Sequence, residues 1–440
     1  MSDITFDALR ELPVLILDGA TGTGLMAAGM PRGVCVERWV LEHPQVLIDW
    51  QKQYLAAGSR LLLTPTFGAN RARLALFGEQ DNVAELNRRL AALTVEAADG
   101  KALVAGDVSP TGLFCEPFGD ASFEELVAIY AEQIAALKEA GVDLIFAETM
   151  MSLGDVRAAV VAARDAGLPV IASVTMDGGS RTLSGMTPEA AVLCLQAAGA
   201  DAVGLNCSTG VEDMAALLPG MRQVARVPLA AKPNAGTPEA PLPPESFGPL
   251  CAAMAAEGAL LLGGCCQSSP AHIAALTDAL KKAAGTAADA VSPAAAALPA
   301  LLQTLCGGAT ESLSAAKKAV PDLTGLPLCF ENRIFPDTAD GEAGLALSEP
   351  LACDADLEDA LLDADDGDAQ AALIRIRPGD DVRCIARSCF MSPLPVALCC
   401  TDDSLLESAL RIFPGRAAVL CQSAAQRKIA LRWGAMLLPD

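Results

Sequence analysis

Three cysteines stand at positions where their side chains can act together. Cys207 ends the apolar run DAVGLNC, and Cys265 and Cys266 end a second run, ALLLGGCC. Both runs are short, rich in Val, Leu and Ala, and followed by turn residues, which is typical of buried strands. Two strands that end in thiols at one edge of a sheet bring three sulfurs together. Three thiolates suit a soft divalent metal, above all Zn²⁺, and leave a fourth position for a substrate.

The alternative interpretation of these cysteines is core packing. Free cysteine is among the most buried residue types, and the chain has 15 cysteines. The three are set apart by their shared strand-end position and by the preceding pair Gly263–Gly264, which lets the backbone present two neighbouring thiols. Cys399 and Cys400 lie inside an apolar run without such glycines. For that second pair we expect a place in the buried core.

Eight apolar runs in the first 285 residues each finish in a polar or reactive residue. The runs cover 14–18, 60–64, 102–107, 143–148, 170–175, 201–206, 229–234 and 259–264. Their ends are Asp18, Thr64, Asp107, Glu148, Thr175, Asn206 with Cys207, Lys232 with Asn234, and Cys265 with Cys266. Amphipathic, Ala-rich helices separate the runs, one of them with Ser122 as the expected N-cap and Gly141 as its stop. Eight strand–helix pairs predict an α/β fold, a (β/α)8 TIM barrel whose strand ends meet at one face, and a doubly wound open sheet is the alternative.

Composition excludes several classes of function. The chain has 31 basic and 54 acidic residues and a formal charge of −23, so we expect neither nucleic acid nor a membrane surface as partner. The N-terminus lacks the basic region of a secretory signal, and no apolar run is long enough to span a bilayer. We therefore expect a soluble, cytoplasmic protein. We then expect its cysteines to be reduced and some of them to be metal ligands.

The 440 residues predict more than one domain. We expect the barrel over 1–285, an Ala/Pro-rich connector over 286–320 and a small α/β domain over 321–440. In the last region, the runs 371–376, 394–400, 416–421 and 435–439 predict strands, with helices between the last three. The acidic stretch 354–370 is interpreted as a solvated helix and loop, and a docking surface for a basic partner is the alternative.

Seven segments of the first region carry a resemblance to a known family. They are DGATGTGL (18–25), TPTFGANR (64–71), GDVSPTG (106–112), AETM (147–150), GLNCSTG (204–210), KPNAG (232–236) and GGCCQSSPAHI (263–273). In this order the chain resembles the homocysteine S-methyltransferases. That family includes the homocysteine-binding module of cobalamin-dependent methionine synthase, betaine–homocysteine methyltransferase and S-methylmethionine-dependent enzymes.

The resemblance implies a zinc-dependent enzyme that transfers a methyl group to the thiol of homocysteine, giving methionine. It implies a (β/α)8 barrel with Zn²⁺ held by Cys207, Cys265 and Cys266, which are also the catalytic residues, and Asn234 is the candidate for an exchangeable fourth ligand. Glu148 matches the acidic residue that meets the substrate amino group. The remaining substrate-binding residues implied are Asp18, Gly19, Ala20 and Thr21, whose turn offers N–H groups to the substrate carboxylate, and Asn206. Asp18 is interpreted as structural or as a hydrogen-bond partner, and His272 as a helix-surface residue or a neighbour of the ligands.

The methyl donor is not implied by these motifs. The chain has no D-x-H-x-x-G segment for cobalamin, so our leading expectation is a methylated corrinoid on a separate protein. S-methylmethionine or betaine as donor, or another thiol as acceptor, are alternatives. A non-enzymatic alternative is a zinc- or thiol-binding scaffold or sensor in a corrinoid methyltransferase complex. Two departures from the family pattern, Pro65 and the QSS segment (267–269), lie near the expected mouth and can alter donor or substrate.

The C-terminal region resembles part of the methyltetrahydrofolate-binding barrel of methionine synthase, over the run that begins LPVALCCTDD. It is too short to close a barrel, and no strand ends in the Asp-x-Asn pattern that holds the pterin. Arg375 and Arg377 stand there instead. We expect a reduced remnant of a pterin-binding domain that serves packing, formation of a homodimer or docking of a partner, and we do not expect folate binding.

Overall fold

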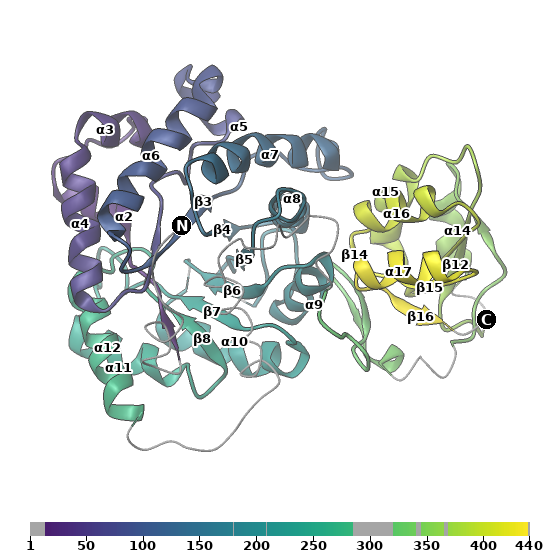
Figure 1. Cartoon of the computed structure of the whole chain (residues 1–440). Helices are drawn as coiled ribbons and strands as arrows, with labels where there is room; N and C mark the ends of the chain where they lie inside the picture. The colour runs from purple at the N-terminus through teal and green to yellow at the C-terminus, as the bar shows by residue number, and fades with distance from the viewer. Residues whose placement is uncertain are drawn as a thin grey trace.

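The computed structural model describes residues 14–178, 180–207, 209–284, 320–339, 345–364 and 368–438. These residues form a large barrel and a smaller α/β unit beside it (Figure 1). The expected connector over 286–320 lies outside the described residues except for its last position. Within the described part of the chain, no helix is both long and apolar enough to cross a membrane.

The barrel contains eight parallel strands, all in runs where strands were expected. They are β1 (Leu15–Ile16), β2 (Leu61–Leu63), β3 (Leu103–Val108), β4 (Leu144–Met150), β5 (Val170–Val174), β6 (Ala202–Asn206), β7 (Leu229–Lys232) and β8 (Ala259–Leu262). The strand order is β1-β8-β7-β6-β5-β4-β3-β2. The first and last strands in this order, β1 and β2, are adjacent in the barrel. Between them, the Arg60 N–H donates a hydrogen bond to the Ile16 carbonyl over 2.8 Å. The prediction of a (β/α)8 barrel is confirmed, and the open doubly wound sheet is wrong.

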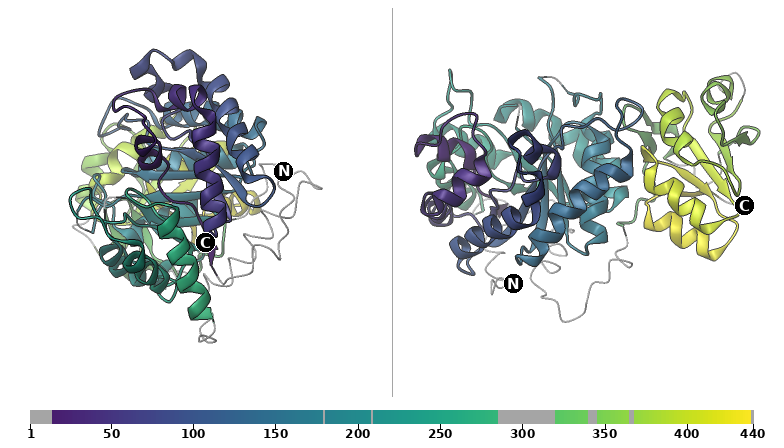
Figure 2. Two further views of the ribbon diagram at one scale, coloured as in Figure 1. Left: turned by 90° about the vertical axis from the view of Figure 1, so that its left-hand side faces the viewer. Right: turned by 90° about the horizontal axis from the view of Figure 1, so that it is seen from above.

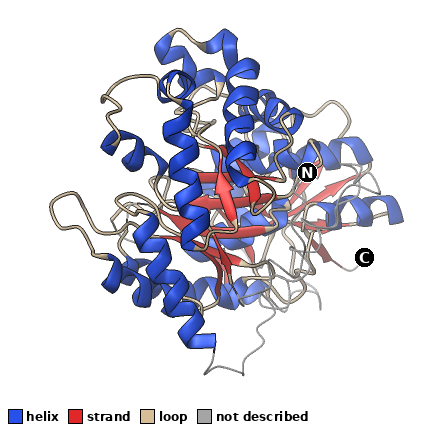
Figure 3. Cartoon of the chain, turned by 60° about the vertical axis from the view of Figure 1, so that its left-hand side comes forward, coloured by secondary structure: helices blue, strands red, loops and turns tan. Residues whose placement is uncertain are grey.

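Helices surround these strands (Figure 3). They are α2 (Thr21–Ala27), α3 (Val36–Glu42), α4 (Pro44–Ala57), α5 (Arg71–Leu74), α6 (Val83–Ala98), α7 (Phe123–Glu139), α8 (Leu153–Asp165), α9 (Pro188–Ala198), α10 (Val211–Val224), α11 (Pro244–Ala253) and α12 (Pro270–Ala284). Helix α7 begins as expected, because Ser122 and Glu125 form a reciprocal capping box. Gly141 follows its end with φ of +86°, a conformation that glycine adopts without strain.

The barrel interior is apolar in its middle and polar at the carboxyl ends of the strands. Alternate strand residues such as Leu103, Ala105, Leu144 and Phe146 form one buried cluster inside the barrel. Because side chains in a strand alternate between faces, the next inward position along β4 is Glu148. By the same alternation, β3 presents Asp107 inward, β6 Asn206 and β7 Lys232. A layer of polar side chains therefore lies on the apolar core at the carboxyl ends of the strands.

The C-terminal unit has two sheets. The first is antiparallel, in the order β10-β9-β14, and the second is parallel, in the order β11-β12-β13-β15-β16. The strands are β9 (Leu328–Phe330), β10 (Ile334–Phe335), β11 (Leu351–Ala352), β12 (Ala372–Ile376), β13 (Val396–Cys400), β14 (Gly415–Arg416), β15 (Ala418–Leu420) and β16 (Met436–Leu438), and the helices are α14 (Leu357–Asp363), α15 (Arg383–Ser388), α16 (Asp403–Ile412) and α17 (Ala424–Arg432). The four expected strands are β12, β13, β15 and β16. Strands β9, β10, β11 and β14 were not predicted, because Gly, Pro or charged residues interrupt the sequence around each of them.

The C-terminal unit packs against helices α8 and α9 of the barrel (Figures 1 and 2). The buried Arg157 of α8 donates to the Leu410 carbonyl over 2.7 Å. Farther along the same helix, Arg164 donates to the Arg432 carbonyl over 2.7 Å. On α9, the Sγ atom of Cys194 lies 3.6 Å from that of Cys329. Side chains from both units thus share one interface.

Cys399 and Cys400 are buried, as expected.

Candidate active site

The three expected cysteines converge at the carboxyl ends of β6 and β8. Their Sγ atoms all lie within 4.8 Å of one another, and those of Cys207 and Cys266 are 3.7 Å apart. Among the described residues, no other group of three His, Cys, Asp or Glu side chains is as close. Cys266 is exposed, and Cys207 and Cys265 are half-buried, so the cluster opens to solvent. Cys207 has φ of +60°, an unusual backbone conformation for a residue with a side chain.

Glycines let the end of β8 pack against the turn after β1. The Gly264 N–H donates to the Asp18 carbonyl over 3.0 Å. A Cβ atom on Gly263 would lie 2.6 Å from that same carbonyl oxygen. Ser268, from the QSS segment that departs from the family pattern, joins the same two turns. Its hydroxyl donates to the Cys265 carbonyl over 2.7 Å and accepts the Ala20 N–H over 3.0 Å.

A buried lysine lies in the polar layer beneath the thiols. The Lys232 Nζ atom is 3.0 Å from Glu148 Oε2 and 3.7 Å from Asp18 Oδ1. Burial raises the pKa of Asp18 to about 6, although the nearby Lys232 ammonium acts in the opposite direction. Burial and the charge of Glu148 also raise the pKa of Asp107. The carboxylate of Glu148, which is expected to bind the substrate amino group, is therefore oriented by the buried ammonium of Lys232.

Asn206 is buried between the expected substrate-binding carboxylate and the thiols. Its Oδ1 atom accepts the Thr149 N–H and the Ser173 hydroxyl, each over 2.8 Å. Its Nδ2 atom donates to Thr149 Oγ1 over 2.8 Å and contacts Cys265 Sγ at 3.8 Å. Thr149 has φ of +59°, which these hydrogen bonds stabilise. The Asn206 amide therefore contacts groups from β4 and β5 as well as the thiol cluster, and sequence reasoning missed Ser173 and Thr149.

Asn234 lies in the loop after β7, next to the cluster. Its Oδ1 atom is shielded from solvent and has no hydrogen-bond partner among the described residues. The following residue, Ala235, donates its N–H to the Cys266 carbonyl over 2.9 Å. A buried amide oxygen without a partner is rare in folded proteins, so this atom suits the role of a metal ligand.

The turn after β1 is only partly free for a substrate. The Ala20 N–H is already donated to Ser268, and the Ala20 carbonyl accepts from Trp50 Nε1 over 3.1 Å and from the Tyr54 hydroxyl over 3.0 Å. A Cβ atom on Gly19 would lie 2.7 Å from that hydroxyl oxygen. Helix α2 begins at Thr21, and N–H groups in a first turn have no acceptor within their helix. The N–H groups from Thr21 onward are therefore the better donors for a carboxylate.

His272 does not lie on the helix surface. It is buried, with Nδ1 2.9 Å from the Ser269 hydroxyl and Nε2 2.8 Å from the Leu242 carbonyl. The imidazole thereby ties the start of α12 to the loop that follows β7.

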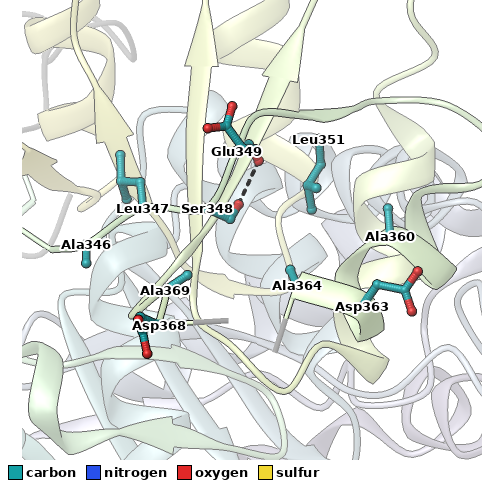
Figure 4. Close-up of a pocket in the computed structure, with 10 residues that line it drawn as sticks. All are labelled: Ala346, Leu347, Ser348, Glu349, Leu351, Ala360, Asp363, Ala364, Asp368 and Ala369. Carbon is teal, nitrogen blue, oxygen red and sulfur yellow. Dashed lines mark hydrogen bonds between the residues drawn. The ribbon is translucent and has the colours of Figure 1, made fainter. Parts of the chain in front are cut away.

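A separate pocket of about 680 Å³ lies in the C-terminal unit between β11 and α14 (Figure 4). Its lining consists of Ala346, Leu347, Ser348, Glu349, Leu351, Ala360, Asp363, Ala364, Asp368 and Ala369. Three carboxylates and small apolar side chains offer no soft metal ligand. The chemistry that the sequence predicts therefore belongs to the thiol cluster at the barrel mouth.

Fold and site together define a (β/α)8 barrel with a three-cysteine cluster at the carboxyl ends of its strands. The family model described as homocysteine S-methyltransferase matches residues 15–280, and the chain belongs to this family. The resemblance found in the sequence motifs is thereby confirmed.

Two further comparisons place the chain among relatives. It is 32% identical over 286 residues to methionine synthase of Mycobacterium tuberculosis, which covers 59% of this chain and 24% of that protein, and methionine synthase of Mycobacterium leprae matches to the same extent. The matched region thus spans about a quarter of these relatives. The metallated form of the homocysteine methyltransferase MmuM of Escherichia coli aligns with a TM-score of 0.54 and 26% identity, over 62% of this chain and 98% of that one.

Proposed function

We propose that this protein is a zinc-dependent methyltransferase that methylates the thiol of homocysteine to give methionine. The observation that carries the proposal is the convergence of Cys207, Cys265 and Cys266 at the barrel mouth of a chain that belongs to this family. In the reaction, a sulfur–carbon bond to homocysteine forms while the bond between the methyl group and its donor breaks.

The side chains of the cluster are suitable ligands for zinc. Three cysteine sulfurs within 4.8 Å suit a tetrahedral site with one open position. Asn234 Oδ1, buried without a described partner, would be the exchangeable fourth ligand. Zinc bound there would lower the pKa of the substrate thiol, about 8.5 when free, and so supply the thiolate nucleophile.

The residues around the cluster would bind and orient homocysteine. The Glu148 carboxylate would accept hydrogen bonds from the substrate ammonium, and Lys232 at 3.0 Å would hold that carboxylate in place. Asn206 would hold the side chains of Thr149 and Cys265 in fixed positions relative to each other, because its amide contacts both of them. The first-turn N–H groups of α2 from Thr21 onward would face the substrate carboxylate.

A methylated corrinoid carried by a separate protein is our proposed donor. The chain matches methionine synthases over about a quarter of their length, and its motifs resemble the homocysteine-binding module of the cobalamin-dependent enzymes, which supports a corrinoid as the donor. S-methylmethionine and betaine remain the small-molecule alternatives, and another thiol is the alternative acceptor. The experiment incubates zinc-loaded protein and homocysteine with each donor in turn and quantifies methionine by mass spectrometry. Methionine from none of the donors would reject the activity and favour the scaffold or sensor.

The ligand assignment has its own test. Cys266→Ala should lower bound zinc from one per chain to well below one and abolish methyl transfer, because two thiols hold zinc far more weakly than three. Metal content is measured by inorganic mass spectrometry after gel filtration. Cys35→Ala, which changes a half-buried cysteine outside the cluster, is the control and should keep its zinc. Unchanged zinc in the Cys266 variant would show the assignment to be wrong.

A further inference from the structure

The C-terminal unit contacts the catalytic face of the barrel as well as its side. Glu331, which follows β9, is buried at 7% exposure. Its Oε1 atom accepts the N–H of Leu153, the first residue of α8, over 2.9 Å, and it also accepts the Ser184 hydroxyl. Leu153 belongs to the segment after β4 and Ser184 to the segment after β5. One carboxylate from the second unit therefore holds two loops at the barrel mouth.

The first of these loops continues directly from the expected substrate-binding strand. Glu148 and Thr149 lie at the end of β4, and α8 begins at Leu153. The Ser184 hydroxyl also lies 3.2 Å from the carbonyl oxygen of Met151, within this loop. Ser184 thus connects the second loop to the first, and Glu331 contacts both of them. We refer to Glu331, the Leu153 N–H and the Ser184 hydroxyl as the Glu331 clamp.

The clamp has the chemistry of a specific contact. The N-terminus of an α-helix presents N–H groups without helical partners and a partial positive charge, so it favours a carboxylate. Burial raises the pKa of Glu331, while its hydrogen bonds with Ser184 and Leu153 act in the opposite direction. A glutamate is costly to bury at a mere packing interface, and an apolar residue would pack there at lower cost.

A third loop at the same face also meets the C-terminal unit. Arg387 lies 3.2 Å from Glu116, in the segment after β3. Close by, the rings of Phe118 and Phe390 pack edge to face with centroids 4.6 Å apart. The segments after β3, β4 and β5 therefore all rest on one unit, while the thiols lie after β6 and β8.

We propose that Glu331 is a positioning residue, through which the C-terminal unit sets the conformation of the loops after β4 and β5 and thereby the placement of Glu148. The clamp stands on geometry alone, whereas its effect on homocysteine rests on the proposed function. The C-terminal unit is then a part of the substrate site rather than an inert appendage.

Hydrogen exchange of the full-length protein tests the clamp without any enzyme assay. Glu331→Ala should speed amide exchange in peptides covering 149–156 and 180–187, because the Leu153 N–H and the Ser184 hydroxyl lose their acceptor. Arg411→Ala is the matched control. It removes ion pairs with Glu124 and Asp165 at the same interface but away from these loops, so exchange there should stay as in the wild type. Unchanged exchange in Glu331→Ala, or an equal rise in Arg411→Ala, would overturn the proposal.

Steady-state kinetics test the consequence for the substrate. Glu331→Ala should raise KM for homocysteine by about tenfold, with a smaller change in kcat, because misplaced binding groups weaken capture of the substrate. Glu331→Gln should restore part of the loss, since its amide oxygen can still accept the Leu153 N–H. If Glu331→Ala does not fold, Ser184→Ala removes one arm of the clamp and should show the same two effects in weaker form. Faster loop exchange with an unchanged KM would reject the effect on homocysteine, and absence of activity in the wild type would reject only the proposed function.

Discussion

Lys232 is the residue on which the polar layer of the barrel depends. It is buried at 3% exposure, and its ammonium lies near the carboxylates of Glu148 and Asp18. Its Nζ atom also sits 5.1 Å from the centroid of the Phe146 ring, at the boundary with the apolar core. Buried charges persist when they are paired, so each member of this group depends on the others.

Removing the cation should destabilise the protein in a pH-dependent way. Lys232→Met leaves buried carboxylates without their partner, and we expect a loss of about 3–5 kcal/mol in the free energy of unfolding. The pKa of Asp18 is raised to about 6, so the stability it contributes is present below about pH 4 and is lost as the pH rises through about 6. Because Lys232 lowers this pKa, its removal extends the loss upward, and the variant should be harmed more near pH 8 than near pH 5.

Urea unfolding at both pH values measures the effect. Lys101→Met is the control, because Lys101 is paired with Asp99 on the surface and should change stability by less than about 0.5 kcal/mol. Equal destabilisation of the Lys232 variant at the two pH values would contradict the assigned charge pairing.

At the scale of elements, the turn after β8 positions two of the three thiols. Its backbone passes so close to the turn after β1 that position 263 has no room for a side chain. Hydrogen bonds of Ser268 then fix the distance between the two turns. The register of β8 against β1 thus decides where Cys265 and Cys266 lie.

Gly263→Ala tests this role of the turn. Its new Cβ atom would lie 2.6 Å from the Asp18 carbonyl oxygen, so we expect a loss of about 1–3 kcal/mol in stability together with weaker zinc binding. Gly22→Ala is the matched control, because a Cβ atom there meets nothing within 4 Å. Thermal unfolding and metal analysis of both variants give the comparison. A Gly263 variant with normal stability and full zinc content would show that the turn tolerates a side chain.

At the scale of the whole molecule, the two units share an interface that covers two helices of the barrel. Helix α8 is buried over most of its length, including Arg157 and Arg164, because it lies between the barrel strands and the C-terminal unit. Helix α9 is likewise buried from Pro188 to Ala198, apart from Glu189. Helix α9 in particular is apolar on nearly all sides, and such a helix is expected to be covered all round.

A chain that ends at residue 284 should therefore be less stable and more prone to aggregation than the full chain. Loss of the C-terminal unit would expose the apolar outer faces of α8 and α9 and leave Arg157 without its acceptor at Leu410. We expect association or aggregation and a lower unfolding temperature than for the full chain, measured by light scattering and calorimetry. Supplying residues 320–440 as a second chain should restore part of the stability. A monomeric fragment as stable as the full chain would contradict this view of the interface.

The amino-acid sequence by itself determined the barrel and the identity of the clustered thiols. Strand-forming runs with reactive ends predict a (β/α)8 barrel because local periodicity and chain order decide which ends share a face. The cysteines followed directly, since Cys207, Cys265 and Cys266 stand next to those runs. Part of the C-terminal unit was also predictable, because β12, β13, β15 and β16 each lie in a longer apolar run of the sequence.

Only the tertiary structure decided what surrounds the thiols. The Ser268 link between two turns, the multiple contacts of Asn206 and the burial of His272 depend on side chains that meet across the barrel. The contact of Glu331 with Leu153 joins residues 178 positions apart. No local pattern encodes such a pair, because the contact exists only after α8 and the C-terminal unit have packed together.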